Sequence, residues 1–225
     1  MAPRVALAGG IESDHAMDRT REAQLVQHVM DGDRAALGDL LEKYKDRLYN
    51  VVLRMVGSRD EAVDVAGQAM LNIIQGIDSY RGPAAISTWM IRIAMNTSIS
   101  HLRKRRLRQV ISLDGSDRSD HEDQSTPLRE QLANQREPAP DQNVQDREMV
   151  GLLQAAIGRL EEQFRSVLVL RDIDEMDYQQ IAMVLSVPVG TVKSRLFRAR
   201  LSLRHAMLKL VKRQQAPAAQ REGLA

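Results

Sequence analysis

The sequence predicts an all-α fold, organised as two small helical domains that a flexible acidic linker joins. Aromatic residues make up only 3% of the 225 residues while hydrophobic residues reach 43%. The cores must therefore rest on aliphatic side chains, methionine and alanine, which favour helices over sheets. Apolar residues recur at steps of three and four through much of the chain, which is the helical period. No long run of β-branched residues alternates with polar ones, as a strand would require.

The composition also excludes several classes of protein. The chain has no cysteine, which excludes disulfides and thiolate metal sites and suits a reducing cytosol, so we expect a cytoplasmic protein. No apolar stretch approaches the ~20 residues that span a bilayer, so membrane insertion is not expected. The apolar run within residues 1–10 is too short for a signal peptide, and we expect residues 1–20 to form a disordered extension.

The first domain is predicted over residues 21–108, where four apolar stripes of helical period follow one another. These stripes lie at residues 22–30, 37–55, 62–77 and 86–97. Ser58 offers an N-cap to the third helix, and Glu61, three residues later, suggests a capping box. A polar loop that contains Gly82-Pro83 separates the third helix from the fourth. The fourth helix ends in the basic cluster that begins at Arg103.

A linker is predicted over residues 109–145, because this stretch lacks periodicity and its acids outnumber its arginines. Such a composition buries too little apolar surface to fold. Composition alone is satisfied by a plain solvated tether, whereas a mimic of nucleic acid in a basic channel is implied only by the family resemblance given below. A second helical domain follows over residues 146–212, and residues 213–225 form a tail.

The most informative segment is a predicted helix-turn-helix near the C-terminus. Asp177 can cap a short helix with Gln180 as its capping-box partner, and Pro188 opens the next helix after a tight break. The second helix has an apolar inner face and an outer face that carries Lys, Arg, Ser and Thr. Such a helix fits the major groove of DNA, where basic side chains pair with phosphates and other polar side chains meet base edges. An ordinary helical hairpin with a solvated face is the structural alternative.

Three segments resemble the extracytoplasmic-function sigma factors. The C-terminal segment reads YQQIAMVLSVPVGTVKSRLFRARLSLR, which is similar to the promoter-reading domain of that family. The N-terminal segments GDRAALGDLLEKYKDRLYNVVLRMVGSRDEAVDVAGQAML and IDSYRGPAAISTWMIRIAMNTSISHLRKRR resemble the family's first domain. The resemblance runs from about residue 22 to residue 211. It implies an alternative sigma factor that binds core RNA polymerase, directs it to promoters through their −10 and −35 elements, and assists promoter opening.

The resemblance also implies partners and a docking surface. Core RNA polymerase would be contacted through its β′ clamp helices and its β flap, and an anti-sigma factor is a further candidate partner. The clamp contact would fall on Asp64, Gln68 and Leu71. The family usually shows Ala-Glu-Asp followed by Gln-Glu here, whereas this chain has Val63 between Ala62 and Asp64, and Gly67 before Gln68.

Promoter DNA is the other implied partner, and the resemblance assigns residues to each element. The −35 element would be read by Thr191, Lys193, Ser194, Arg195, Phe197 and Arg198, with Phe197 equally suited to a DNA contact or to packing. The −10 element would be captured by Tyr80, Arg81, Arg92 and Asn96, with phosphates gripped by Arg103, Lys104, Arg105 and Arg106. We expect Trp89 to belong to the core rather than to the DNA surface.

No pattern indicates an enzyme, a cofactor or a metal site. A glycine-rich phosphate loop, a metal-ligand cluster and a nucleophile–base pair are all missing from the sequence, and the five histidines are scattered. Two rival functions remain. A conventional helix-turn-helix repressor or activator would leave the first domain unexplained. A sigma-like decoy that binds only an anti-sigma protein would have no use for the basic face around Lys193, Arg195 and Arg198.

Overall fold

The computed structural model describes residues 21–82, 84–114 and 142–215, and within these ranges every regular element is helical. The all-α prediction is therefore confirmed. Residues 21–30 form a first helical segment. The elements that follow are α2 (Arg34–Val56), α3 (Arg59–Gly76), the short helix η1 (Ile77–Ser79), α4 (Ile86–Asp114), α6 (Gln142–Gly158), α7 (Glu162–Leu168), the π-helical turn η2 (Val169–Ile173), α8 (Tyr178–Leu185) and α9 (Val189–Gln215).

The ends of α2 and α3 follow from local chemistry, with one correction. The Asp33 carboxylate accepts the backbone N–H groups of Ala35 and Ala36 at 2.8 and 3.3 Å, and α2 ends at Gly57 with φ +82°, a conformation that favours glycine. Ser58 caps α3 by accepting the Glu61 N–H at 3.5 Å. The predicted capping box is wrong, because the Glu61 side chain turns away to bind α4 instead of the Ser58 N–H.

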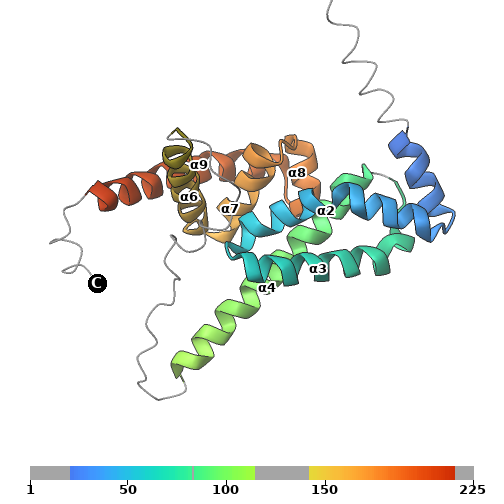
Figure 1. The fold of residues 1–225 in the computed structure, drawn as a ribbon, viewed down its shortest axis with the longest axis horizontal. Helices are drawn as coiled ribbons and strands as arrows, with labels where there is room; N and C mark the ends of the chain where they lie inside the picture. The colour runs from blue at the N-terminus through green and yellow to red at the C-terminus, as the bar shows by residue number, and fades with distance from the viewer. Residues whose placement is uncertain (1–20, 83, 115–141, 216–225) are drawn as a thin grey trace, which may run out of the picture.

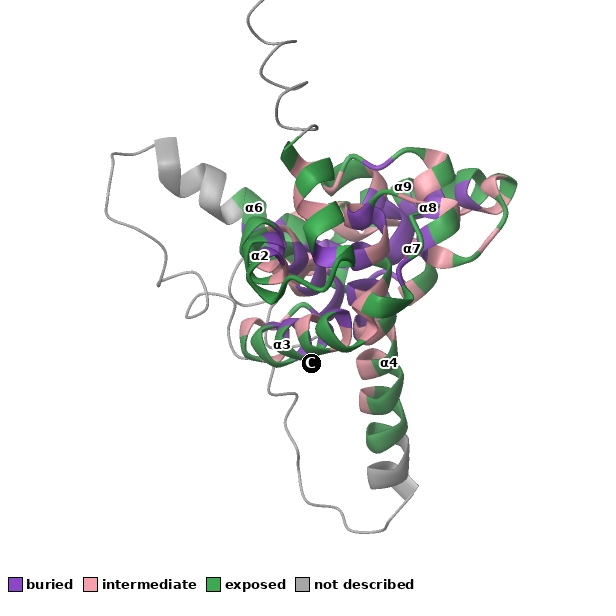
Figure 2. Ribbon diagram, turned by 90° about the vertical axis from the view of Figure 1, so that its right-hand side faces the viewer, coloured by how far each residue is buried: buried purple, intermediate pink, exposed green. Residues whose placement is uncertain are grey.

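The helices form two groups, which Figure 1 shows side by side. The N-terminal helices α2, α3 and α4 pack against one another, and the C-terminal helices α6, α7, α8 and α9 do the same. The second half of α4 projects beyond the body of the molecule (Figure 2), and the residues of its last described turns are mostly exposed. None of the described helices has the length and apolar character needed to cross a membrane.

The predicted linker is shorter at both ends than the sequence suggested. Residues 109–114 continue α4, and residues 142–145 already belong to α6. The sequence between Arg108 and Asp114 holds neither glycine nor proline, so nothing in it stops the helix. The remainder of the predicted linker, residues 115–141, lies outside the described residues, as do the predicted extension at residues 1–20 and most of the tail.

One large hydrophobic cluster runs through both groups of helices, and a smaller one joins α6 to α9. Buried side chains such as Leu48 and Ile91 from the N-terminal helices join Leu170 and Ile181 from the C-terminal helices in one cluster. The contacts between the groups are made by α4 on α8 and by α2 on α6, α7 and η2. The described structure is therefore a closed arrangement in which the two predicted domains share buried surface.

Two arginines add polar contacts between the groups. Arg47 of α2 donates to both carboxylate oxygens of Asp174 at 2.7 and 3.0 Å, and the Asp174 side chain is only 6% exposed. The hydrogen bond to Asp174 raises the pKa of the Arg47 guanidinium. Arg165 of α7 is buried and donates to the carbonyl oxygen of Met55 at 2.5 Å and to that of Leu160 at 3.0 Å.

Candidate functional site

The helix-turn-helix is built as the sequence predicts. The Asp177 carboxylate accepts the N–H groups of Gln179 and Gln180, both at 2.8 Å, and the Gln180 side chain accepts the Asp177 N–H at 2.9 Å. This reciprocal capping box fixes the start of α8. Ser186 ends α8 in the left-handed conformation with φ +53°, and α9 starts just after Pro188. A turn of three residues, Ser186 to Pro188, therefore separates α8 from α9.

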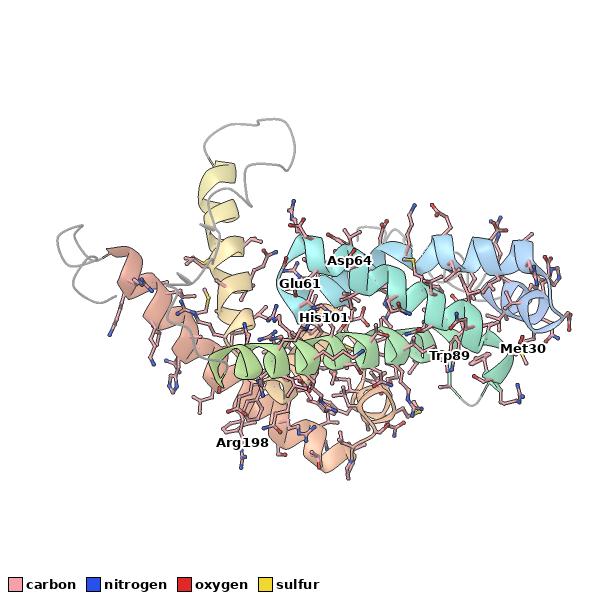
Figure 3. The ribbon with its side chains drawn as sticks, turned by 90° about the horizontal axis from the view of Figure 1, so that it is seen from below. Met30, Glu61, Asp64, Trp89, His101 and Arg198 are labelled. Carbon is pink, nitrogen blue, oxygen red and sulfur yellow. The ribbon has the colours of Figure 1, made fainter. Side chains whose placement is uncertain are left out.

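The outer face of α9 carries the predicted −35 residues, while the inner face is core. Val192, Leu196 and Ala199 are buried. Lys193, Ser194, Phe197 and Arg198 are exposed, and Thr191 and Arg195 are half-buried at the edges of that face. Figure 3 shows Arg198 pointing away from the body of the molecule.

Phe197 is the clearest departure from a packing role. Its side chain is 72% exposed, although it directly follows the buried Leu196. Its exposure leaves the ring free to contact a partner. Of the two roles that the sequence left open for Phe197, packing in the core is excluded in this arrangement.

The basic side chains of this face differ in the contacts they make within the protein. Arg200 is engaged within the C-terminal helices, since it binds both carboxylate oxygens of Asp172 at 2.5 and 3.0 Å. Lys193 lies 5.7 Å from the Tyr178 ring centroid, in cation–π geometry. Among the described residues, no carboxylate forms an ion pair with Lys193, Arg195 or Arg198. These three cations are available to an external polyanion.

A cavity of about 540 Å³ lies where the loop before α4 meets α8. Tyr80 and Trp89 line it, with ring centroids 5.6 Å apart, and Arg81 and Arg92 add positive charge. Tyr80 is only 7% exposed and donates its hydroxyl to the Ala84 carbonyl at 2.7 Å. Burial raises the pKa of Tyr80, so its hydroxyl stays protonated.

The far wall of this cavity comes from the helix-turn-helix. Met183 of α8 and Ser186 at its end line the space, and Arg92 donates to the Ser186 hydroxyl at 3.5 Å. In the closed arrangement, α8 thus covers the aromatic pocket that the resemblance assigns to −10 capture. Trp89 is half-buried and packs against the shared core as expected, but it also faces this cavity.

Asn96, predicted to work with Tyr80, lies in a different place. It lines an open groove of about 660 Å³ between α3 and α4, together with Asp64, Gln68 and Lys104. The reason is helical geometry, because each four-residue step advances the side chain by about 40° beyond a full turn. Arg92, Asn96 and Lys104 therefore drift around α4 from the aromatic cavity towards α3. The structure brings two predicted −10 residues, Asn96 and Lys104, into the same groove as two predicted polymerase-binding residues.

The basic cluster on α4 is partly engaged. Arg105 donates to the Glu61 carboxylate at 2.8 Å, and His101 Nε2 lies 3.1 Å from the same oxygen. Arg103 forms a longer ion pair with Glu162 at 3.7 Å. Sequence reasoning assigned no role to the pairing of His101 and Glu61. His101 and Arg105 are four residues apart and so share one face of α4, which is the sequence feature that could have indicated a common partner.

The three predicted polymerase-binding residues, Asp64, Gln68 and Leu71, lie on the outer surface of α3 and are all exposed. Gln68 donates to the Asn72 amide oxygen at 3.0 Å, and Asn72 donates to the Thr97 hydroxyl at 3.2 Å. This chain of hydrogen bonds ties α3 to α4. Figure 3 shows Asp64 on the outer side of α3, at the edge of the molecule.

Each of the two groups of helices matches a protein-family model. Residues 40–108 match the model of sigma-70 region 2, and residues 151–203 match that of sigma-70 region 4. The RNA polymerase sigma-H factor of Pseudomonas aeruginosa is 32% identical over 203 residues, which cover 87% of this chain and 98% of that protein. The extracytoplasmic-function sigma factor SigW of Bacillus subtilis is 32% identical, covering 80% and 92%. The sigma-E factor of Escherichia coli K12 is 31% identical, covering 84% and 95%.

Solved structures share the fold. The structure of CnrH in complex with the cytosolic domain of CnrY superposes with a TM-score of 0.57 at 18% identity, covering 84% of this chain and 97% of that one. RpoE of Bartonella quintana, crystallised with the anti-sigma factor NepR, gives a TM-score of 0.56 at 22% identity, covering 76% and 96%.

Proposed function

The chain belongs to the extracytoplasmic-function sigma factors, which direct RNA polymerase to promoters, and we propose that it does so through three separate surfaces. The first is the outer face of α9, the second is the aromatic cavity beside α4, and the third is the outer face of α3. The observation that carries this assignment is the capped helix-turn-helix, whose second helix presents Lys193, Ser194 and Arg198 to solvent. As an initiation factor it needs no catalytic group of its own.

The −35 contact is proposed to place α9 in the major groove. Arg198 and Lys193 can reach base edges or phosphates, and Ser194 can donate or accept a hydrogen bond. Arg195 and Thr191 lie at the edges of the face, where the sugar–phosphate backbone would pass. Phe197 can meet a thymine methyl group. Support comes from the exposure of this face and from its cations, which form no ion pair with any described carboxylate.

The −10 contact is proposed to hold an unstacked base in the aromatic cavity. Base capture needs an aromatic wall and hydrogen-bond donors, and Tyr80, Trp89, Arg81 and Arg92 supply these groups. Asn96, Lys104 and Arg106 would then hold the strand as it continues along α4. Because α8 walls one side of this cavity in the closed arrangement, the proposal includes a movement of the helix-turn-helix away from α4 to admit the strand.

The remaining partners are also proposals. Core RNA polymerase is the partner of the α3 face and, through the β flap, of the C-terminal helices. An anti-sigma factor remains a predicted partner, and one of the solved structures with this fold, RpoE with NepR, is a complex of that kind. The cytoplasm, where polymerase and promoters meet, is the proposed site of action.

In vitro transcription tests the function. Purified chain and core polymerase are combined with a library of promoter templates, and transcripts are mapped to their start sites. We expect promoter-dependent transcripts that neither component makes alone. A folded chain that yields no such transcript on any template would refute the proposal. A footprint on duplex DNA without polymerase would favour the conventional repressor or activator instead.

A further inference from the structure

The aromatic cavity between the loop before α4 and α8 has the size and the composition of a small-molecule site. Its volume of about 540 Å³ lies within the range of about 300–1,000 Å³ that such sites span, and such sites combine apolar and aromatic walls with a few polar groups. Tyr80, Trp89 and Met183 form its walls, while Arg81 and Arg92 supply positive charge. None of the described residues that line the cavity carries a carboxylate. The cavity therefore fits a planar apolar ring that bears negative charge.

The two arginines of the cavity are available to an anion. Arg92 donates a long hydrogen bond to the Ser186 hydroxyl at 3.5 Å. Arg81 donates to the carbonyl oxygens of Asp78 and Tyr80. Within the described ranges, no carboxylate forms an ion pair with either arginine. Because a guanidinium binds phosphate through two parallel hydrogen bonds, the charge of this cavity suits a phosphate group.

The aromatic rings of the cavity suit a nucleic-acid base. The ring planes of Tyr80 and Trp89 are tilted by 55° to each other, so they form two separate walls. Tyr80 is buried, whereas Trp89 is half-buried near the start of α4 (Figure 3) and offers the larger accessible ring. Bases of any sequence stack on aromatic side chains. Trp89 is therefore the main stacking partner that the cavity offers to a base.

The cavity has all its walls only in the closed arrangement. Trp89 and Arg92 come from the N-terminal helices, whereas Met183 and Ser186 come from α8 and its end. A ligand small enough to lie inside the cavity contacts both groups of helices, so its binding stabilises the closed arrangement. A DNA strand differs, because its flanking nucleotides must pass out of the cavity and α8 walls one side. A single nucleotide and a strand should therefore shift the chain in opposite directions.

We propose that this cavity binds a free nucleoside monophosphate, and that the bound nucleotide holds the chain in the closed arrangement. The base stacks on Trp89, and the phosphate pairs with Arg92 and Arg81. This inference rests on the proposed function, because the nucleotide occupies the cavity assigned to the −10 base and keeps the helix-turn-helix against α4. The free nucleotide is thus a negative regulator, whose effect on the arrangement of the helices is opposite to that of the promoter strand.

The test uses the fluorescence of Trp89, the only tryptophan of the chain. The full-length chain is titrated in parallel with adenosine monophosphate (AMP), adenosine and inorganic phosphate. AMP should quench Trp89 and bind at least about tenfold more tightly than adenosine or phosphate, since neither of these meets both the ring and the arginines. Arg92→Gln should weaken AMP binding by roughly tenfold through loss of a charge-assisted pair. Arg108→Gln, a matched control at an exposed position further along α4, should bind AMP like the wild type.

The contribution of α8 is tested separately. Met183→Glu should also weaken AMP binding by roughly tenfold, because in the closed arrangement the new carboxylate faces the phosphate. Met149→Glu is the matched control, since Met149 of α6 is 53% exposed and lies outside the cavity, while Met183 is 44% exposed. If Met183→Glu binds AMP as tightly as the wild type, α8 does not contact the nucleotide, and the inference is refuted. An opening of the helices on addition of AMP, seen by energy transfer between labels on α3 and α9, would refute it as well.

These measurements need no polymerase, so they separate the inference from the function. If AMP neither quenches Trp89 nor releases heat in calorimetry, while the chain supports promoter-dependent transcription, only the inference is refuted. Equal affinities for AMP and adenosine would refute the role of the phosphate, and with it the inference. If AMP binds as expected but no template yields a promoter-dependent transcript with core polymerase, the proposed function fails and the nucleotide site remains.

Discussion

Replacing Asp174 by asparagine should open the closed arrangement. Asp174 accepts two hydrogen bonds from Arg47 across the junction between the groups of helices, and its side chain is 6% exposed, while that of Arg47 is 39% exposed. A hydrogen bond to a charged group contributes about 1.5–3 kcal/mol when buried, whereas an exposed ion pair contributes at most about 1 kcal/mol. Solvent at Arg47 places this pair between those limits, at roughly 1–2 kcal/mol. The ratio of closed to open molecules should fall about five- to thirtyfold.

Single-molecule energy transfer measures this ratio directly. The chain has no cysteine, so cysteines introduced at the exposed positions Gln75 on α3 and Lys209 on α9 would carry the only labels. Asp174→Asn should increase the low-transfer population. Asp172→Asn is the matched control, because Asp172 binds Arg200 with the same two-oxygen geometry within the C-terminal helices. Identical transfer distributions for the wild type and both variants would refute the claim that the Arg47–Asp174 pair holds the groups together.

Three further predictions address binding and stability. Arg198→Ala should reduce transcription from promoters that depend on a −35 element by roughly tenfold and leave core binding unchanged; loss of core binding would contradict the role given to Arg198. Asp177→Ala should lower the free energy of unfolding by about 1 kcal/mol through loss of the α8 cap, while Gln179→Ala, two positions further on, should change it little in the same thermal melt. Arg165→Met should cost about 2–4 kcal/mol in urea unfolding, because buried carbonyl oxygens lose their donor; an unchanged midpoint would show that water replaces the guanidinium.

Features that depend on a few adjacent residues were predictable from the sequence. The capping box of Asp177 and Gln180 formed as expected, because both partners lie within one helical turn. The end of α2 at Gly57 likewise needed only a residue that tolerates positive φ. The inner and outer faces of α9 followed from the helical period, and the buried Leu196 beside the exposed Phe197 shows how sharply that period divides them.

Features that depend on competition between distant partners were not predictable in this way. Ser58 and Glu61 have the spacing of a capping box, yet Glu61 binds Arg105, which lies 44 residues further along the chain. A guanidinium is a charged donor and offers a stronger hydrogen bond than a backbone amide. The Arg47–Asp174 pair spans 127 residues, and no local pattern could associate the two.

The aromatic cavity shows the functional consequence of this difference. Resemblance identified Tyr80 and Arg92 as groups that could hold a base, but only the structure shows Met183 and Ser186 of α8 against the same space. Because α8 walls one side of this space, we expect it to oppose the passage of a DNA strand into the cavity. A strand that binds there should then shift the population towards molecules in which the helix-turn-helix has moved away. Weakening the Arg47–Asp174 pair should consequently increase the affinity of the isolated chain for single-stranded −10 DNA. When the open form is the minor one, this increase should equal the five- to thirtyfold rise in the open population. An affinity that stays constant while the open population rises would show that α8 does not obstruct the cavity.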